Sequence, residues 1–298
     1  MVPEGTQVGA RIIDGKAIAA EVREQVRAEV AGLVDAGARA PGLATVLVGE
    51  DPASEIYVAN KHKACEQAGM RSLHHGLAAS TSERELLELL DRLNTDDEVD
   101  GILVQLPLPE AIDPDHVVAA IDPVKDVDGL TPTNAGLLAH GSPGLVPCTP
   151  AGVMELLRHE GVELEGAEAV VVGRSKLVGR PLASLLLGAN ATVTSCHSRT
   201  RELAATCARA DVLVAAVGAP RLLGAEAVKP GAVVIDVGMN RIDDPSTKSG
   251  TRLVGDVDFE SARAVASLIT PVPRGVGPMT IALLLRNTVR AAERAVAA

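Results

Sequence analysis

The chain has 298 residues, which is more than one typical domain and enough for two. Hydrophobic residues make up 47% of the sequence and are nearly all aliphatic or alanine, which suits sizeable cores and buried parallel strands. The net charge of −11, without a basic block, argues against nucleic-acid binding, and no apolar stretch approaches the length of a membrane span.

The N-terminus and the cysteines indicate the compartment in which the protein works. Residues 1–14 lack the basic start and apolar run of a signal peptide. The four cysteines (Cys65, Cys148, Cys196 and Cys207) include no CxxC pair, so reduced thiols are the simplest interpretation. We therefore expect a cytoplasmic protein.

Helices and strands are expected to alternate in the first half of the chain. Apolar residues at helical spacing predict an amphipathic helix over residues 16–36, and the aliphatic run 43–48 predicts a buried strand. Asp51-Pro52 has the form of a helix start, and Ser82-Glu83-Arg84-Glu85 has capping-box spacing ahead of a leucine-rich helix. With a further strand at 101–106, this order predicts a parallel α/β layer.

The middle of the chain, residues 107–150, is rich in Pro, Gly and Asp and shows weak periodicity. We expect an irregular segment here, and a long irregular segment inside a compact domain usually serves a function. The domain boundary is expected near its end, where Thr149-Pro150 starts a helix that runs to Gly161.

The second half repeats a strand–helix rhythm that is typical of a Rossmann-type sheet. Strands are expected at 169–172, 191–195, 212–217 and 232–237, with helices near 181–187 and 201–209. A last helix begins after Pro278 and could pack back on the first domain. The predicted fold class is therefore α/β with two domains.

A candidate phosphate loop, Gly173-Arg174-Ser175-Lys176-Leu177-Val178-Gly179-Arg180-Pro181, follows the predicted strand 169–172. Gly173 lets the backbone turn, and Gly179 allows close approach at the start of a helix whose amides can hold a pyrophosphate. The glycines are six apart and do not form GxGxxG, so an ordinary strand–helix turn is the alternative. The strand–turn–helix context favours a nucleotide site.

The end of the next strand bears on the choice of nucleotide. NAD sites usually place an acid there for the ribose 2′-hydroxyl, but Thr194-Ser195-Cys196-His197-Ser198-Arg199-Thr200 contains none. Arg174, Ser198 and Arg199 together could meet a 2′-phosphate, so we expect NADP rather than NAD. A solvated surface charge is an equally good explanation for Arg199 alone.

A second candidate site joins a helix turn to a strand end. Tyr57, the only tyrosine, lies four residues before Lys61, so the two share a helix face. An aromatic ring beside an amine can stack a flat substrate and help to move a proton. Gln105 is polar at the carboxyl end of an aliphatic strand, where α/β sheets bind ligands. The alternatives are a solvated lysine and a polar edge-strand residue.

The acids and histidines nearby do not predict a metal site. Asp126-Val127-Asp128-Gly129 lacks EF-hand spacing, and a buried carboxylate facing paired N–H donors of a ligand is the preferred interpretation. His62 with Cys65, and the His74-His75 pair, lack a second pair at zinc-ligand spacing. We interpret these as packing or surface residues.

Together these segments resemble the bifunctional methylenetetrahydrofolate dehydrogenase/methenyltetrahydrofolate cyclohydrolases, the FolD family. The resemblance runs from Ile12-Ile13-Asp14-Gly15-Lys16 to the final helix. The motifs that carry it are Tyr57-x-x-x-Lys61, the segment Gly101 to Pro109, Lys125 to Gly129, Pro147-Cys148-Thr149-Pro150, the Gly173 to Pro181 loop and the Pro271 to Thr280 loop. No single motif is specific, but their combination is.

The resemblance implies oxidation of 5,10-methylenetetrahydrofolate with NADP and then hydrolysis to 10-formyltetrahydrofolate, in one-carbon metabolism and purine biosynthesis. It implies a catalytic domain of residues 1–148 plus 278–298, a Rossmann-type NADP-binding domain of residues 149–277, an active-site cleft between them and a homodimer. No metal is implied.

The resemblance also implies roles for individual residues. Lys61 would be the catalytic lysine, Gln105 would orient it, and Asp128 would accept hydrogen bonds from the pterin ring. Substrate contacts would come from Tyr57, which would stack on the pterin, and from Ser54, Pro273 and Gly277. NADP contacts would come from Gly173, Arg174, Ser175, Val178, Gly179, Pro181, His197, Ser198 and Thr200.

One position departs from the family pattern. The loop Thr270-Pro271-Val272-Pro273-Arg274-Gly275-Val276-Gly277-Pro278-Met279-Thr280 is rigid because it holds three prolines, and a loop of this kind is more often a binding wall than a connector. The family usually has glycine where this chain has Arg274. If the backbone there has positive φ, arginine strains it by about 1 kcal/mol or more. Alternatively, the side chain could add a charge near the glutamate tail of the folate.

Three other functions remain open on the sequence alone. Another NADP-dependent dehydrogenase of the shikimate type would share the two-domain plan but would not explain Tyr57, Gln105 and Asp128 together. A non-catalytic nucleotide-sensing protein would bind NADP without turnover. A monofunctional dehydrogenase of the same family is disfavoured by the presence of Lys61 and Gln105.

Overall fold

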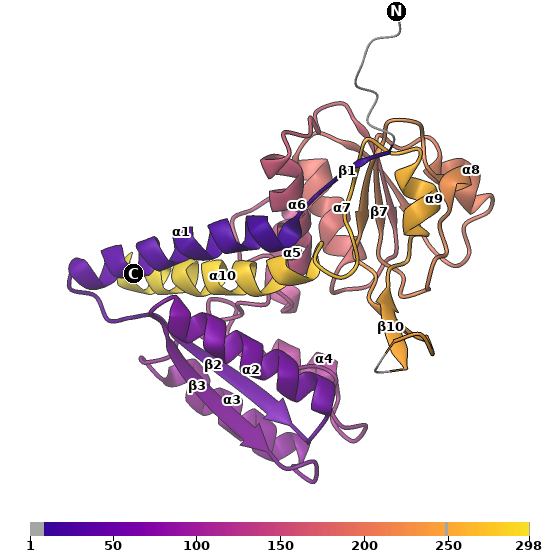
Figure 1. Cartoon of the computed structure of the whole chain (residues 1–298). Coiled ribbons are helices and arrows are strands. Elements are labelled where there is room, and N and C mark those ends of the chain that lie inside the picture. Colours follow the sequence, from indigo (N-terminus) through magenta and orange to yellow (C-terminus); the bar gives the residue numbers. More distant parts are fainter. Residues whose placement is uncertain (1–8, 248–249, 298) are drawn as a thin grey trace, which may run out of the picture. The chain divides into compact units, whose positions relative to one another are not determined.

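The protein folds into two compact units, seen here in a computed structural model that describes residues 9–247 and 250–297 (Figure 1). One unit contains residues 20–148 and 281–297, and we call it the three-stranded unit. The other contains residues 9–19 and 149–280, and we call it the six-stranded unit. Within the described residues, no helix is long and apolar enough to span a membrane.

The three-stranded unit is built on a parallel sheet with the order β3-β2-β4. Its strands are β2 (Gly42–Val48), β3 (Arg71–Leu77) and β4 (Gly101–Val104). The central strand β2 is buried at every position, because helices cover both faces of the sheet. Helix α3 (Glu83–Thr95) packs its leucines against alternate residues of β2 and β4, while α2 (Pro52–Gln67) contacts β2 and β3. The predicted parallel α/β layer is therefore confirmed.

Two predicted helix starts are present with their capping hydrogen bonds. Asp51 caps α2, since its Oδ2 accepts from the Ser54 amide at 2.8 Å. Ser82 and Glu85 form a complete capping box at the start of α3. These caps satisfy amides that have no partner inside the helix, so they fix where each helix begins.

The expectation of an irregular segment over residues 107–150 is wrong in part. The structure has α4 (Pro114–Ala119) and α5 (Pro132–His140) there, and α6 (Cys148–His159) begins at its end. Asp113 caps α4 and Thr131 caps α5, each directly before a proline, which is the same signal as Asp51-Pro52. Helices of six and nine residues are too short to show the apolar periodicity on which the prediction relied.

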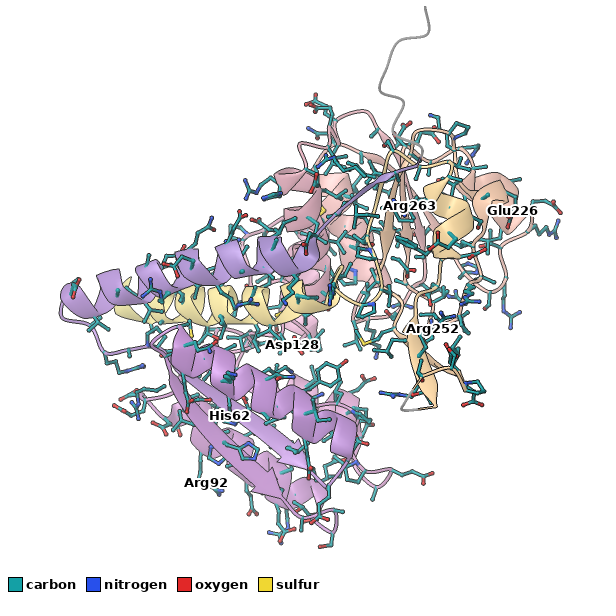
Figure 2. All side chains as sticks on the ribbon, in the orientation of Figure 1. His62, Arg92, Asp128, Glu226, Arg252 and Arg263 are labelled. Atoms are coloured by element: carbon teal, nitrogen blue, oxygen red, sulfur yellow. The ribbon has the colours of Figure 1, made fainter. Side chains whose placement is uncertain are left out.

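Strand β3 was not predicted. Its sequence, Arg71-Ser72-Leu73-His74-His75-Gly76-Leu77, has no aliphatic run because it lies at the edge of the sheet, with residues exposed along it. The ring of His74 meets that of His62 edge-on, with centroids 5.0 Å apart. Figure 2 shows His62 on α2, beside the sheet. The two histidines therefore join α2 to β3, in agreement with their interpretation as packing residues.

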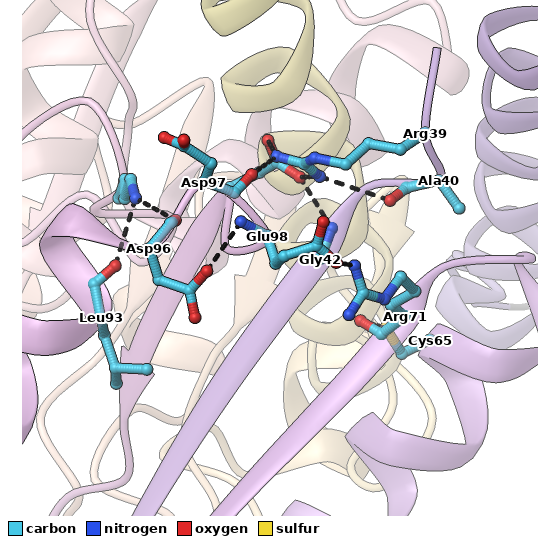
Figure 3. Close-up of polar contacts among 11 residues, drawn as sticks. Arg39, Ala40, Gly42, Cys65, Arg71, Leu93, Asp96, Asp97 and Glu98 are labelled. Atoms are coloured by element: carbon cyan, nitrogen blue, oxygen red, sulfur yellow. Dashed lines mark hydrogen bonds and ion pairs between the residues drawn. The ribbon is translucent and has the colours of Figure 1, made fainter. Parts of the chain in front are cut away.

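The buried Asp100 ties the start of β2 to the loop before β4, in the region where Figure 3 shows Arg39, Gly42 and Asp97. Arg39 donates to both carboxylate oxygens of Asp100, at 2.6 and 2.8 Å. The amide of Gly42 donates to the same carboxylate at 2.7 Å. Arg39 also donates to the carbonyl of Asp97. This bidentate arrangement neutralises a carboxylate that is almost fully buried.

The six-stranded unit is built on a parallel sheet with the order β1-β11-β8-β7-β5-β6. Its strands are β1 (Arg11–Ile12), β11 (Leu268–Ile269), β8 (Val233–Asp236), β7 (Val212–Ala215), β5 (Glu168–Val172) and β6 (Thr192–Cys196). From residue 149 onward, the chain enters the sheet at β5, moves outward to β6, and then crosses to β7 and continues to β8 and β11 on the other side. This doubly wound order has its switch point between β5 and β7, which is where such sheets bind ligands.

The sheet of this unit also contains an N-terminal strand that was not predicted. Strand β1 pairs with β11, and Ile13 donates its amide to the carbonyl of Ile269 at 2.9 Å. The predicted domain boundary placed residues 1–148 together, whereas the structure places residues 9–19 with the six-stranded unit. A strand of two residues carries no detectable periodicity. Residues 1–8 lie outside the described part of the chain.

The remaining elements complete each unit. The two helices predicted for the second half are present as α7 (Gly179–Gly188) and α8 (Leu203–Cys207). Four short elements were not predicted: the hairpin strands β9 (Asn240–Asp243) and β10 (Thr251–Val254), the single turn η1 (Ala225–Ala227) and the helix α9 (Phe259–Arg263). The long helices are α1 (Gly15–Asp35) and α10 (Gly277–Ala297). Residues 281–297 of α10 belong to the three-stranded unit, whereas residues 277–280 belong to the six-stranded unit, and Arg286 donates to Gln25 of α1 at 2.8 Å.

Replacing Asp100 by alanine should lower the free energy of unfolding by about 2–3 kcal/mol, because Arg39 and the Gly42 amide both lose their acceptor. Urea denaturation followed by circular dichroism measures this change. The control is Arg84→Ala, which removes an exposed ion pair to Glu88 and should cost less than about 0.5 kcal/mol. Equal effects of the two substitutions would contradict the structural role of Asp100.

Candidate active site

Lys61 and Gln105 meet where α2 passes the carboxyl end of β4. The Lys61 Nζ donates to the Gln105 Oε1 at 2.9 Å. The Gln105 Nε2 in turn donates to the carbonyl of Leu106 at 2.7 Å, which turns the amide oxygen of Gln105 toward the lysine. Lys61 and Gln105, which were predicted as site residues on separate elements, therefore lie together. The backbone after β4 fixes the position of the Lys61 amine through Gln105.

Three titratable groups influence one another at this place. Burial lowers the pKa of Lys61, while the nearby Asp128 and Cys148 act in the opposite direction. Burial raises the pKa of Asp128, and Lys61 partly offsets this. Burial and the neighbouring Asp128 raise the pKa of the Cys148 thiol well above its usual value. An amine whose pKa moves toward neutral pH is suited to accepting and returning a proton.

The two acids of the Asp126-Val127-Asp128-Gly129 turn have different surroundings. Asp126 is buried and accepts hydrogen bonds from the Thr131 amide at 2.8 Å and from the Asn134 Nδ2 at 2.9 Å. It therefore shapes the turn that leads to α5. Asp128 is only partly buried, lies within the electrostatic influence of Lys61 and is labelled in Figure 2. Asp128 is the carboxylate of this pair that is available for chemistry.

Tyr57 and Ser54 lie on the turns of α2 before Lys61. The ring of Tyr57 is 44% exposed, so a flat ligand can reach it. Ser54 is buried, and its amide completes the helix cap formed by Asp51. The structure therefore leaves Tyr57 accessible and encloses Ser54 within the unit.

Cys148 belongs to this site, and the sequence analysis gave it no role. Its Sγ donates to the carbonyl of Val127 at 3.3 Å, one residue from Asp128. A lone cysteine outside a CxxC pair is usually a small buried hydrophobic residue, which is why its type alone carried no signal. Its place in the motif Pro147-Cys148-Thr149-Pro150 was the only indication.

The candidate phosphate loop joins β5 to α7 at the switch point of the six-stranded sheet. Gly173 has φ 132°, and a Cβ there would collide with the carbonyl oxygen of Ala216. A Cβ on Gly179 would collide with the carbonyl oxygen of Gly173, so the helix start packs directly on the strand end. Ser175 stabilises the loop, because its Oγ accepts from the amides of Val178 and Gly179 at 3.1 and 3.4 Å. Pro181 is buried in the first turn of α7.

The neighbouring strand end presents cations and hydroxyls instead of an acid. Val172 of β5 pairs with Cys196 of β6, so Arg174 and Ser198 each lie two residues beyond a paired position, and both are exposed. The turn that follows is closed by the His197 amide, which donates to the Thr200 Oγ1 at 2.9 Å. This arrangement fits a 2′-phosphate. Arg199 is exposed as well, which is compatible with both interpretations of that residue.

The sequence analysis missed two buried acids, Asp236 at the end of β8 and Asp256 just after β10. Burial raises the pKa of Asp236 to about 6, although three backbone amides donate to its carboxylate. Asp256 accepts from the amides of Val217 and Gly218 at 2.6 and 3.0 Å and from the Asn240 Nδ2 at 2.8 Å. Together the two acids fix the conformation of the loops after β7, β8 and β10, at the edge of the sheet where ligands bind.

The loop from Pro271 to Thr280 lies in the six-stranded unit, so Pro273 and Gly277 are in a different unit from Lys61. Arg274 has φ 86°, which is the left-handed region that favours glycine. Gly277 begins α10, and a Cβ there would approach the exposed Met239 at 3.3 Å.

No group of three or more His, Cys, Asp or Glu side chains within residues 9–247 and 250–297 is arranged to hold a metal ion. The site that the described residues do form is an amine, an amide, a carboxylate and an exposed aromatic ring in the three-stranded unit. The six-stranded unit adds a glycine loop at a helix start. These features define an α/β enzyme with a catalytic domain and a dinucleotide-binding domain.

Comparison with known proteins gives the family. Residues 13–128 match the model for the "Tetrahydrofolate dehydrogenase/cyclohydrolase, catalytic domain", and residues 147–296 match the model for its "NAD(P)-binding domain". "Bifunctional protein FolD 2" of Frankia casuarinae is 59% identical over 288 residues, which cover 97% of this chain and 98% of that protein.

Solved structures agree. The FolD methylenetetrahydrofolate dehydrogenase/cyclohydrolase of Campylobacter jejuni has a TM-score of 0.92 at 47% identity, covering 96% of this chain and 99% of that one. The Trypanosoma brucei enzyme, complexed with NADP and an inhibitor, has a TM-score of 0.92 at 43% identity, covering 97% and 99%. The chain belongs to the tetrahydrofolate dehydrogenase/cyclohydrolase family, as the resemblance of its motifs predicted.

Replacing Arg274 by glycine should raise the free energy of unfolding by about 0.5–1 kcal/mol, because glycine relieves the strain at φ 86° but is more flexible in the unfolded chain. Chemical denaturation measures the change. Arg274→Ala is the matched control, since it removes the charge and keeps the strained Cβ, and it should leave the stability nearly unchanged. Equal stabilisation by both substitutions would assign the effect to the charge.

Replacing Asp128 by asparagine should lower the pKa of Lys61 further, because the carboxylate is the main group that raises it. At a given pH, more of the Lys61 amine is then neutral. Titration of ¹³C-labelled lysine by NMR measures this pKa directly. Glu66→Gln removes an exposed carboxylate from the same helix and should leave the Lys61 pKa unchanged. An unchanged pKa in Asp128→Asn would show that the two groups do not interact.

Proposed function

We propose that this protein oxidises 5,10-methylenetetrahydrofolate to 5,10-methenyltetrahydrofolate with NADP and then hydrolyses the product to 10-formyltetrahydrofolate. The hydrogen bond from Lys61 to Gln105, beside Asp128, carries the proposal, since a partly buried amine held in this way suits the hydrolytic step. Membership of the family supports both activities.

In the first step the role of the protein is to hold the folate and the cofactor in the correct orientation. Tyr57 would stack on the pterin ring, and Asp128 would accept hydrogen bonds from the ring nitrogens, so that the one-carbon bridge is fixed in place. NADP, held by the loop from Gly173 to Pro181, supplies the acceptor for the hydride of that bridge. Pro273 and Gly277 are proposed as further substrate contacts, whereas the burial of Ser54 makes it a supporting residue of α2 near Tyr57.

In the second step water adds to the methenyl carbon. The Lys61 Nζ takes a proton from this water, and Gln105 keeps the amine in place through its Oε1. The bond between the carbon and the N5 atom of the folate then breaks, and Lys61 returns the proton to N5. The remaining hydroxyl proton leaves as the formyl group forms on N10, so one proton is released overall.

The cofactor residues follow the geometry of the six-stranded unit. Gly173 and Gly179 give the pyrophosphate access to the start of α7, with Ser175, Val178 and Pro181 forming the rest of the loop. Arg174 and Ser198 would bind the 2′-phosphate, and the turn of His197 and Thr200 would support Ser198. We accordingly assign the folate to the three-stranded unit and NADP to the six-stranded unit.

A cytoplasmic homodimer that supplies formyl groups to purine biosynthesis completes the proposal. The family resemblance supports it, and the edge position of β3 leaves one side of that strand available for pairing with a second copy. Light scattering of the purified protein would detect a dimer.

The deciding experiment follows NADPH formation when the purified protein meets 5,10-methylenetetrahydrofolate and NADP, and separates methenyltetrahydrofolate from 10-formyltetrahydrofolate at neutral pH, because acid would convert the second compound back into the first. NADPH formation with little methenyl product means that both activities are present. NADPH formation with accumulating methenyl product means that the hydrolytic step is weak. Absence of NADPH formation, or faster turnover with NAD, would contradict the proposal or its cofactor.

Replacing Lys61 by alanine should reduce the cyclohydrolase rate by about 10²–10⁴-fold, the range expected for the loss of a general acid–base group. NADP affinity should be retained, since the proposed NADP residues lie in the other unit. The control is Lys63→Ala, which removes an exposed lysine from the same helix and should retain both activities. A full cyclohydrolase rate in Lys61→Ala would refute the role of this amine.

A further inference from the structure

Asn287 is a fully buried amide on an otherwise apolar side of α10. Its neighbours Leu283, Leu284 and Val289 are buried aliphatic residues, as expected for a helix that packs against a core. An amide at such a position needs partners, and Asn287 finds them outside its own helix.

The Nδ2 of Asn287 donates to two carbonyls from separate segments. One is Val127 and the other is Val146, both at 2.9 Å. The same nitrogen lies 3.7 Å from the Cys148 Sγ. The two segments also touch directly, since a Cβ on Gly129 would collide with the backbone of Val146. Asn287 therefore holds together the turn before Asp128 and the segment before Cys148.

The carbonyl of Val127 is the centre of this arrangement. It accepts from Asn287 and from the Cys148 thiol, which occupies both lone pairs of the oxygen. Asp128 is the next residue in the chain, so the orientation of this peptide bond helps to set where its carboxylate points. A buried amide on the last helix thereby acts on the group that faces Lys61.

The oxygen of the Asn287 side chain indicates that this residue adds little net stability to the core. Within residues 9–247 and 250–297, its Oδ1 is buried and has no hydrogen-bond partner. An orphaned acceptor offsets much of the stability that the two donated bonds provide. A leucine would avoid the orphaned acceptor but would leave the carbonyls of Val127 and Val146 without this donor, so the effect of the amide lies mainly in the two segments that it holds together.

We propose that Asn287 is a positioning residue for the active site, which fixes Asp128 and Cys148 relative to Lys61 through the carbonyls of Val127 and Val146. This inference rests on the proposed function for its effect on turnover. Its effect on the geometry of the three groups does not depend on turnover and can be measured separately.

The test compares Asn287→Leu with Thr288→Val. Thr288 is equally buried, and its hydroxyl donates to the Leu284 carbonyl of its own helix, so it controls for disturbance of α10. In Asn287→Leu we expect a fall of at least tenfold in kcat for the cyclohydrolase step, with a shifted pH profile, measured at a temperature at which circular dichroism shows the variant to be folded. Both properties should remain as in the native protein in Thr288→Val.

Two further measurements keep the outcome clear. NMR titration should show a lower Lys61 pKa in Asn287→Leu, because Asp128 is no longer held near the amine. Asn287→Asp keeps the shape, donates only when protonated and should lose activity as the pH rises through the pKa of the new acid. This variant also serves if Asn287→Leu does not fold.

The results separate the two proposals. A native protein without folate turnover would refute the proposed function, and the Lys61 titration would still test Asn287. An active native protein with unchanged kcat, pH profile and Lys61 pKa in Asn287→Leu would overturn the positioning role. A parallel loss in Thr288→Val would also overturn it, because the effect would then belong to the helix.

Discussion

The chemistry of the three-stranded unit depends on one amine that is partly withdrawn from water. Burial alone would favour neutral Lys61, and a nearby carboxylate alone would favour the charged form. Because both act together, and because Gln105 fixes the amine by a hydrogen bond, Lys61 is neither an ordinary surface cation nor a permanently neutral group. A group that can take up and return a proton needs this balance, and Asp128 provides half of it.

Close backbone approach imposes the corresponding constraint on the six-stranded unit. Side chains at Gly173 and Gly179 would collide with carbonyl oxygens, so the strand end and the helix start can meet only through glycine. The two glycines are six residues apart and thus do not match the usual fingerprint, yet they lie at the switch point, where doubly wound sheets bind ligands. Glycine is therefore required where two backbone segments pack directly against each other, and the number of residues between the two glycines matters less.

The sequence predicted well those features that repeat or that have a local chemical cause. The aliphatic strands β2, β4, β5 and β7 and the capped helices α2 and α3 all carry such signals, and so do Lys61 and Gln105, each placed at an element where ligands bind. Features that depend on distant partners were missed. Strand β1 exists only because β11 lies beside it, and edge strand β3 has no aliphatic run.

The same distinction applies to the candidate site. Cys148 and Asn287 acquire their roles from contacts with Val127, which is 21 and 160 residues away in the chain. Asp236 and Asp256 look like ordinary surface acids in the sequence, and their importance appears only when the fold buries them among backbone amides. Local patterns cannot report such roles, whereas the family resemblance could supply some of them.

The division of the chain into units has a consequence for biosynthesis. The chain changes unit at residues 19–20, 148–149 and 280–281, so each unit is assembled from separate stretches of sequence. Domains usually form as their residues emerge during translation, N-terminal part first. The three-stranded unit, by contrast, must wait for residues 281–297, which include Asn287. Lys61 is thus made early, but its surroundings are complete only when α10 has left the ribosome.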